Sequence, residues 1–112
     1  MKDWKKVLAE DTARTPLGIG NPGIMQGMGA LKKAAQSKGA LDEKTRELIA
    51  LAIAATTRCE ACIATHVDLA VKAGATRDEL LEALAMTVLL NAGAATVYTS
   101  YILEAFDQFS EK

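Results

Sequence analysis

Few aromatic side chains, a single histidine and only two cysteines are present in this chain of 112 residues. With 4% aromatic but 50% hydrophobic residues, the core must be built from Ala, Leu, Ile, Val and Met. Two cysteines exclude a disulfide-rich secreted scaffold. An excess of one charge sign is also absent: the net charge is −1, which argues against a nucleic-acid-binding protein, because such proteins need clustered Lys and Arg.

A signal peptide is not evident either. Residues 1–7 contain four charged positions and lack the apolar core of such a peptide, so we expect a cytoplasmic location. The basic cluster Lys2, Lys5 and Lys6 is diluted by Asp3, and we interpret it as a solvated helix face.

Alternating polar and apolar strand patterns are missing, and the periodicity is helical throughout. The length fits one domain over residues 1–112, and we expect an all-α, single compact domain of about six helices. The predicted helices cover residues 3–14, 22–39, 59–73, 76–90 and 94–109, with a turn or loop over residues 15–22. A further helix starts after Asp42 and includes residues 48–55. The aliphatic excess for so short a chain predicts that helix packing buries the remainder in an oligomer.

Local sequence signals mark several of these helix ends. Asn21 before Pro22 and Asp42 are candidate N-caps, and Gly74 is a helix-ending glycine. Residues 76–79 form the S/T-x-x-E pattern of a capping box. The helix after Asp42 is apolar on every face over residues 48–55, so it should be central.

Residues 83–103 contain no charged side chain and have the length of a membrane span. Five polar residues are nevertheless scattered through this segment: Thr87, Asn91, Thr96, Thr99 and Ser100. Residues 91–93, Asn-Ala-Gly, resemble a break between two helices. We therefore expect a buried hairpin or kinked pair of helices and no membrane span.

Both cysteines and the histidine fall in one short stretch, Cys59-Glu-Ala-Cys62-Ile-Ala-Thr-His66. At about 100° per residue, the three side chains lie within one sixth of a helix circumference. If a helix starts at or just before Cys59, its N-terminus favours a thiolate, and His66 lies one turn beyond Cys62, where it can accept a proton. Two such sulfurs can pass through a sulfenic acid to a disulfide, which an external dithiol reduces again.

The spacing of Cys59, Cys62 and His66 is also compatible with functions other than redox chemistry. A zinc site would use Cys59, Cys62 and His66, with Glu47 as a conceivable fourth ligand, but a second Cys or His pair is missing. A non-catalytic helical assembly protein with incidental cysteines is the other alternative. Spacing alone does not select Glu47 as a supporting acid/base, because Glu43 and Arg46 lie close by in sequence.

Taken together, Glu47, the spacing of twelve residues to Cys59-x-x-Cys62-x-x-x-His66 and the flanking words resemble the carboxymuconolactone decarboxylase family, in its alkylhydroperoxidase D-like branch. The resemblance covers residues 24–109. It implies an all-α fold assembled as trimers or hexamers. It also implies a thiol-dependent peroxidase, of alkylhydroperoxidase or peroxiredoxin type, which needs neither cofactor nor metal.

In the scheme that the resemblance implies, Cys62 attacks a small-molecule peroxide and Cys59 resolves the product. His66 and Glu47 relay protons, and a dithiol protein of thioredoxin-like or lipoyl type is the reductant. Two departures stand out: Ala61 occupies the place of a histidine in the better-known alkylhydroperoxidases, and those chains carry about two helical units. The decarboxylase branch generally lacks the paired cysteines, so decarboxylation is not expected.

Overall fold

A computed structural model of the chain describes residues 1–10 and 15–111. Its described residues form helices and no strand, which confirms the all-α class. In chain order the six helices are α1 (Trp4–Ala9), α2 (Pro16–Gly20), α3 (Pro22–Ala35), α4 (Glu43–Thr57), α5 (Glu60–Lys72) and α6 (Arg77–Ser110).

Side-chain caps start the helices where the sequence predicts them. The Asp42 carboxylate accepts a hydrogen bond from the Thr45 N–H at 2.8 Å and opens α4. Thr76 and Glu79 form the complete capping box of α6. Asn21 does precede α3, but its side chain makes no capping hydrogen bond, so the fixed φ of Pro22 is the remaining local signal for that start.

Two predicted boundaries were wrong near the N-terminus. The first helix ends at Ala9, and residues 11–14 of the predicted 3–14 helix lie outside the described part. The expected loop contains α2, because the Thr15 hydroxyl caps the Gly18 N–H and Pro16 fits the first helical position. The second predicted helix ends at Ala35, four residues before Gly39.

The largest correction concerns α6, which runs unbroken for 34 residues through the predicted break at Asn91–Gly93. The Asn91 amide donates to the Thr87 carbonyl one turn back, so it supports the helix instead of capping a new one. A glycine costs only about 1 kcal/mol in a helix, and Gly93 has alanines on both sides. The expected buried hairpin is also wrong, because no residue of α6 is buried.

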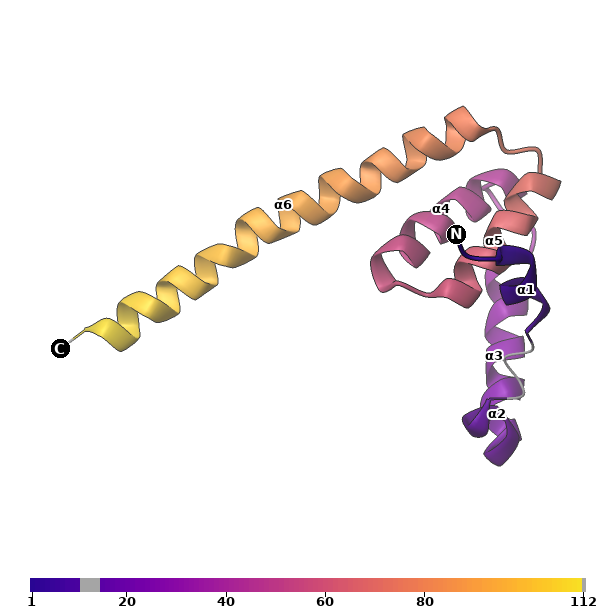
Figure 1. Cartoon of the computed structure of the whole chain (residues 1–112), viewed down its shortest axis with the longest axis horizontal. Helices are drawn as coiled ribbons and strands as arrows, with labels where there is room; N and C mark the ends of the chain where they lie inside the picture. Colours follow the sequence, from indigo (N-terminus) through magenta and orange to yellow (C-terminus); the bar gives the residue numbers. More distant parts are fainter. Residues whose placement is uncertain (11–14, 112) are drawn as a thin grey trace.

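The core is small and lies between α4 and α5. Its buried apolar residues are Leu51 and Ala54 of α4 and Ala64 and Ala70 of α5. α1 packs on α5, and the first turns of α6 pack on α4, after which α6 projects away from the other helices (Figure 1). The central position of α4 is confirmed, although Ile49 and Ile53 on its outer side are exposed.

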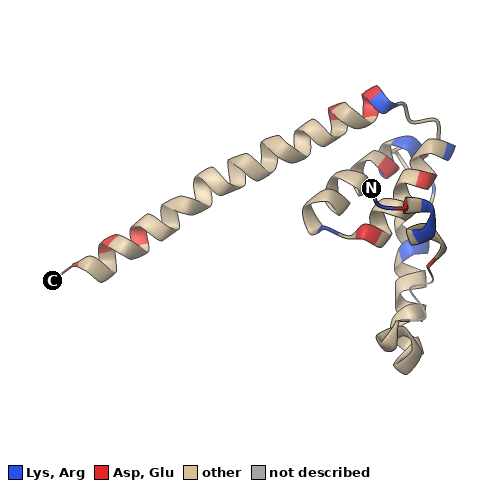
Figure 2. Cartoon of the chain, in the orientation of Figure 1, with Lys and Arg blue, Asp and Glu red and all other residues tan. Residues whose placement is uncertain are grey.

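The isolated chain is extended and not compact. Its radius of gyration is 18.8 Å, whereas a compact domain of this length has about 13 Å. The difference comes from α6, which is long and apolar enough to cross a membrane, a property that buried helices of soluble proteins share. Figure 2 shows that its charged residues are confined to its two ends.

An ion pair fastens the start of α6 to the start of α4. The Lys44 ammonium lies 2.7 Å from the Glu79 carboxylate. The hydrogen bond from Lys44 lowers the pKa of Glu79, and the same bond raises the pKa of Lys44. Because both side chains are about one third exposed, the pair adds little stability and mainly orients the two helices.

Among the residues that the structure describes, Arg58 is the one non-glycine residue with a positive φ, at 55°. It ends α4 in the left-handed conformation. We expect Arg58→Gly to raise the free energy of unfolding by about 1 kcal/mol, because a side chain disfavours that conformation. Urea unfolding followed by circular dichroism measures the change. Thr57→Gly, one residue earlier and still helical, is the control and should destabilise by a similar amount. If Arg58→Gly has a lower free energy of unfolding than the wild type, the left-handed conformation of Arg58 is not strained.

Candidate functional site

The motif occupies the junction between α4 and α5. After Thr57 the chain turns at Arg58, and Cys59 is already the N-cap of α5. This short turn lays α5 back along α4, so that residues far apart in sequence meet across the two helices. The predicted helix start at the cysteines is therefore confirmed.

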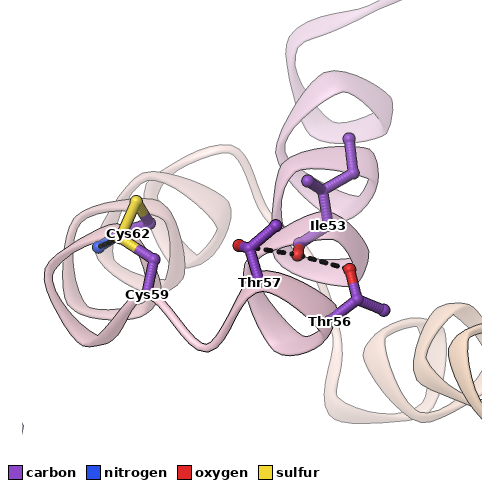
Figure 3. The surroundings of a disulfide bond; sticks show 5 residues. All are labelled: Ile53, Thr56, Thr57, Cys59 and Cys62. Atoms are coloured by element: carbon purple, nitrogen blue, oxygen red, sulfur yellow. Dashed lines mark hydrogen bonds between the residues drawn. A yellow bond between two sulfur atoms is a disulfide. The ribbon is translucent and has the colours of Figure 1, made fainter.

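Cys59 and Cys62 are joined in a disulfide, with Cα atoms 5.2 Å apart. Figure 3 shows the two sulfurs bonded at the first turn of α5, beside the last turn of α4. The Cys62 N–H also lies 3.2 Å from the Cys59 sulfur, which thereby caps the helix. Both residues are half-buried, so the sulfurs are sheltered but not sealed from solvent.

Two threonines stand at the end of α4 next to this disulfide. The hydroxyls of Thr56 and Thr57 both donate to the Ile53 carbonyl, at 2.7 and 3.1 Å (Figure 3). Both bonds therefore end on the same main-chain carbonyl, one turn before the end of α4. The hydroxyl protons are therefore turned to the main chain of α4 and not to the sulfurs.

Glu47 and His66 meet across the two helices. The Glu47 Oε2 atom lies 2.5 Å from His66 Nδ1, although the residues are nineteen positions apart. The Glu47 side chain is 6% exposed and the His66 side chain 21%. A buried carboxylate requires a hydrogen-bond partner, and His66 supplies it.

The structure distinguishes Glu47 from Glu43 and Arg46, the two nearby residues that sequence spacing could not exclude as the supporting acid/base. Glu43 is exposed at the start of α4. The Arg46 guanidinium donates to the Leu41 carbonyl at 2.9 Å, before the helix begins. Of these three, Glu47 is the one that contacts the histidine of the motif.

One contact near the site was not foreseen. Lys2 forms an ion pair with Glu60, which lies between the two cysteines, and its ammonium is 5.6 Å from the centre of the Trp4 ring. The sequence interpretation placed Lys2 on a solvated face, and no periodicity links it to residue 60. Because both partners are about half exposed, this pair contributes little to stability.

The zinc alternative has no cluster of ligands in the described chain. Over residues 1–10 and 15–111, no three His, Cys, Asp or Glu side chains converge in a way that could hold a metal ion. In the oxidised form the two sulfurs are bonded to each other, whereas a zinc ligand is a thiolate.

The arrangement combines an electron-carrying group with a proton-carrying group. A disulfide in the first turn of a helix accepts two electrons and two protons when it is reduced. His66 lies one turn beyond Cys62 on the same face of α5, and the Glu47 carboxylate fixes the orientation of the imidazole through its Nδ1 atom. Such a pairing of imidazole and carboxylate suits general acid–base chemistry.

Comparison with known proteins places this geometry in context. Residues 22–105 match the carboxymuconolactone decarboxylase family. An uncharacterised protein of Haemophilus influenzae is 48% identical over 93% of each chain. The crystal structure of a carboxymuconolactone decarboxylase family protein from Legionella pneumophila, in apo form, superimposes with a TM-score of 0.69 at 39% identity and covers 96% of this chain and 97% of that one.

A more distant similarity reaches an enzyme with a named activity. The alkyl hydroperoxide reductase AhpD of an Anaeromyxobacter strain is 29% identical over 70% of this chain. The match spans 43% of that longer protein. The similarity therefore concerns one part of the enzyme.

Proposed function

Because this chain belongs to the carboxymuconolactone decarboxylase family, we propose that it is a cytoplasmic, thiol-dependent oxidoreductase that reduces a small-molecule peroxide. The observation that carries the proposal is the Cys59–Cys62 disulfide, one turn from an imidazole that a buried carboxylate holds in place. The partial similarity to AhpD supports a peroxide as the oxidant.

In the oxidative half of the cycle, the Cys62 thiolate attacks one peroxide oxygen. The O–O bond breaks, a sulfenic acid forms on Cys62, and the alcohol leaves after it takes up a proton. Cys59 then attacks the Cys62 sulfur. The S–S bond forms and the sulfenic oxygen leaves as water, so two thiols and one peroxide give the disulfide seen in the structure, an alcohol and water.

In the reductive half, an external dithiol protein of thioredoxin-like or lipoyl type attacks the disulfide and supplies two electrons and two protons. The half-buried position of the sulfurs at a helix start leaves them reachable for such a partner. Sulfur carries the electrons, so the cycle includes no cofactor.

His66 takes the proton of Cys62 before attack and returns a proton to the departing oxygen. Glu47 keeps the imidazole oriented through the hydrogen bond to its Nδ1 atom. With Ala61 between the cysteines, the only histidine of the chain has to serve both proton transfers.

Titrating the fully reduced protein with hydrogen peroxide tests the proposal. We expect both thiols to disappear together, in proportion to added peroxide, with the mass falling by two hydrogens. Alkylation of the remaining thiols followed by mass spectrometry gives the count. If Cys62 is alkylated beforehand, the Cys59 thiol should no longer be lost on addition of peroxide. Two free thiols after an excess of peroxide would overturn the assignment.

A further inference from the structure

An acidic side chain lies between the two cysteines in sequence. Glu60 is the first residue of α5 and the acid of its first turn, where the positive end of the helix dipole stabilises a carboxylate. A cysteine thiolate gains from the same dipole. Because a carboxylate and a thiolate in one helical turn are like charges, Glu60 disfavours the ionised form of either cysteine.

A lysine from another helix offsets this negative charge. Lys2, just before α1, forms an ion pair with Glu60, and α1 lies against α5 (Figure 1). The next lysine, Lys5, instead lines the apolar groove that α1 forms with α5 beyond the cysteines. Lys2 is therefore the lysine of this segment that contacts the acid of the motif.

Two local contacts hold Lys2 in this place. Asp3 is the N-cap of α1 and accepts a hydrogen bond from the Lys6 N–H at 3.1 Å, which fixes the start of the helix just after Lys2. The Lys2 ammonium also lies 5.6 Å from the centre of the Trp4 ring, within the range of a cation–π interaction. The ammonium is thus held by both an aromatic ring and the Glu60 carboxylate.

The acid is close enough to affect both sulfurs. The Cα atoms of the cysteines are 5.2 Å apart, and Glu60 directly follows the first of them. Charges interact over a Debye length of about 8 Å at physiological salt, which is longer than one helical turn of roughly 5.4 Å. The charge on Glu60, and its neutralisation by Lys2, therefore both reach the thiols.

The other charged groups around the cysteines have different positions or partners. His66 is paired with Glu47, and Arg58 is exposed in the turn before α5. The helix α6 packs on α4 but places Glu79 on Lys44, at the start of α4, whereas the cysteines follow its end. The ion pair between α1 and α5 is thus a separate contribution to the charge at the motif.

We propose that the ion pair of Lys2 with Glu60 sets the reactivity of the cysteine pair: Glu60 opposes ionisation of the thiols, and Lys2 cancels this effect through its contact with the carboxylate. Lys2 is then a positioning residue, which acts through Glu60 and not on the substrate. The inference rests on the thiol chemistry proposed above, but not on peroxide as the oxidant. Because the exposed pair adds little stability, its removal should change the reactivity and leave the fold intact.

Alkylation of the fully reduced protein by iodoacetamide, followed by mass spectrometry as a function of pH, tests the proposal without peroxide. The thiolate is the form that reacts, so the rate reports its fraction. At neutral pH and low salt we expect Lys2→Gln to react about two- to threefold more slowly than wild type, the effect of one unit charge roughly 8 Å away in water. Its rate–pH profile should shift to higher pH, and that of Glu60→Gln to lower pH. Lys6→Gln, on the same helix, is the control and should match wild type.

A charge exchange separates an electrostatic effect from a structural one. Lys2→Glu combined with Glu60→Lys keeps an ion pair but places the positive charge beside the cysteines, so its alkylation should be about two- to threefold faster than that of wild type. At about 1 M salt, where the Debye length is about 3 Å, the difference between Lys2→Gln and wild type should vanish.

Three results would overturn the proposal: a Lys2→Gln rate equal to that of wild type at low salt, a decrease that persists at high salt, or an exchanged variant as slow as Lys2→Gln. Urea unfolding of every variant verifies that the fold is retained. If the expected shifts appear in a protein whose thiols do not react with peroxide, the proposed function is wrong and the role of the ion pair is supported.

Discussion

Replacing Cys62 by Ser is expected to reduce peroxide consumption to the rate of protein-free buffer, and Cys59→Ser is expected to stop the cycle one step later. A serine hydroxyl is not ionised near neutral pH and does not attack a peroxide, whereas a thiolate does. In Cys59→Ser the sulfenic acid on Cys62 has no resolving sulfur and should accumulate after a single turnover. Dimedone trapping followed by peptide mass spectrometry locates it.

The two variants serve as controls for each other, because both lose the disulfide and differ only in which sulfur remains. A dimedone adduct on Cys59 of Cys62→Ser, with none on Cys62 of Cys59→Ser, would reverse the roles. Both sulfurs lie in the first turn of α5, where the helix dipole favours a thiolate at either position. The neighbouring His66 is the reason for the order proposed here.

Glu47→Gln is expected to lower the rate of reaction with peroxide by about 10²–10⁴, the range that a positioned acid–base pair supplies. Glutamine keeps the size of the side chain and can still contact His66, but it cannot stabilise a protonated imidazole. The decrease should appear in kcat, with little change in KM, because Glu47 contacts His66 and its side chain is only 6% exposed. Stopped-flow oxidation of the reduced protein measures it.

Glu43→Gln is the matched control, since Glu43 lies one turn earlier on α4 and is exposed. It removes the same charge and should leave the rate unchanged. Urea unfolding of both variants separates a loss of fold from a loss of chemistry. Equal rates for wild type and Glu47→Gln, in a folded protein, would remove Glu47 from the mechanism.

The features that short-range chemistry determines were predictable from sequence. Asp42 and Thr76 are caps because their oxygens reach N–H groups three residues ahead, whatever the rest of the chain does. The shared face of Cys59, Cys62 and His66 follows from helical periodicity alone. The choice of Glu47 over Glu43 needed the crossing of α4 and α5, which no local pattern encodes.

The missed features depend on long-range packing. Asn91 and Gly93 weaken a helix without breaking it, so the surroundings decide whether the chain turns there. The contact of Lys2 with Glu60 arises because α1 packs on α5. No local sequence pattern around either residue predicts it. The helix α2 is five residues long, too short for periodicity to distinguish it from a turn.

The position of Cys59 as N-cap, three residues from its partner, has a consequence for how fast the protein can work. Dithiol and disulfide occupy the same first helical turn, where Cα atoms are 5.2 Å apart even when the sulfurs are bonded. Switching between the two oxidation states therefore requires no local unfolding, unlike an enzyme that must bring remote sulfurs together. The reactions with oxidant and reductant, and not motion of the backbone, then set the rate of turnover.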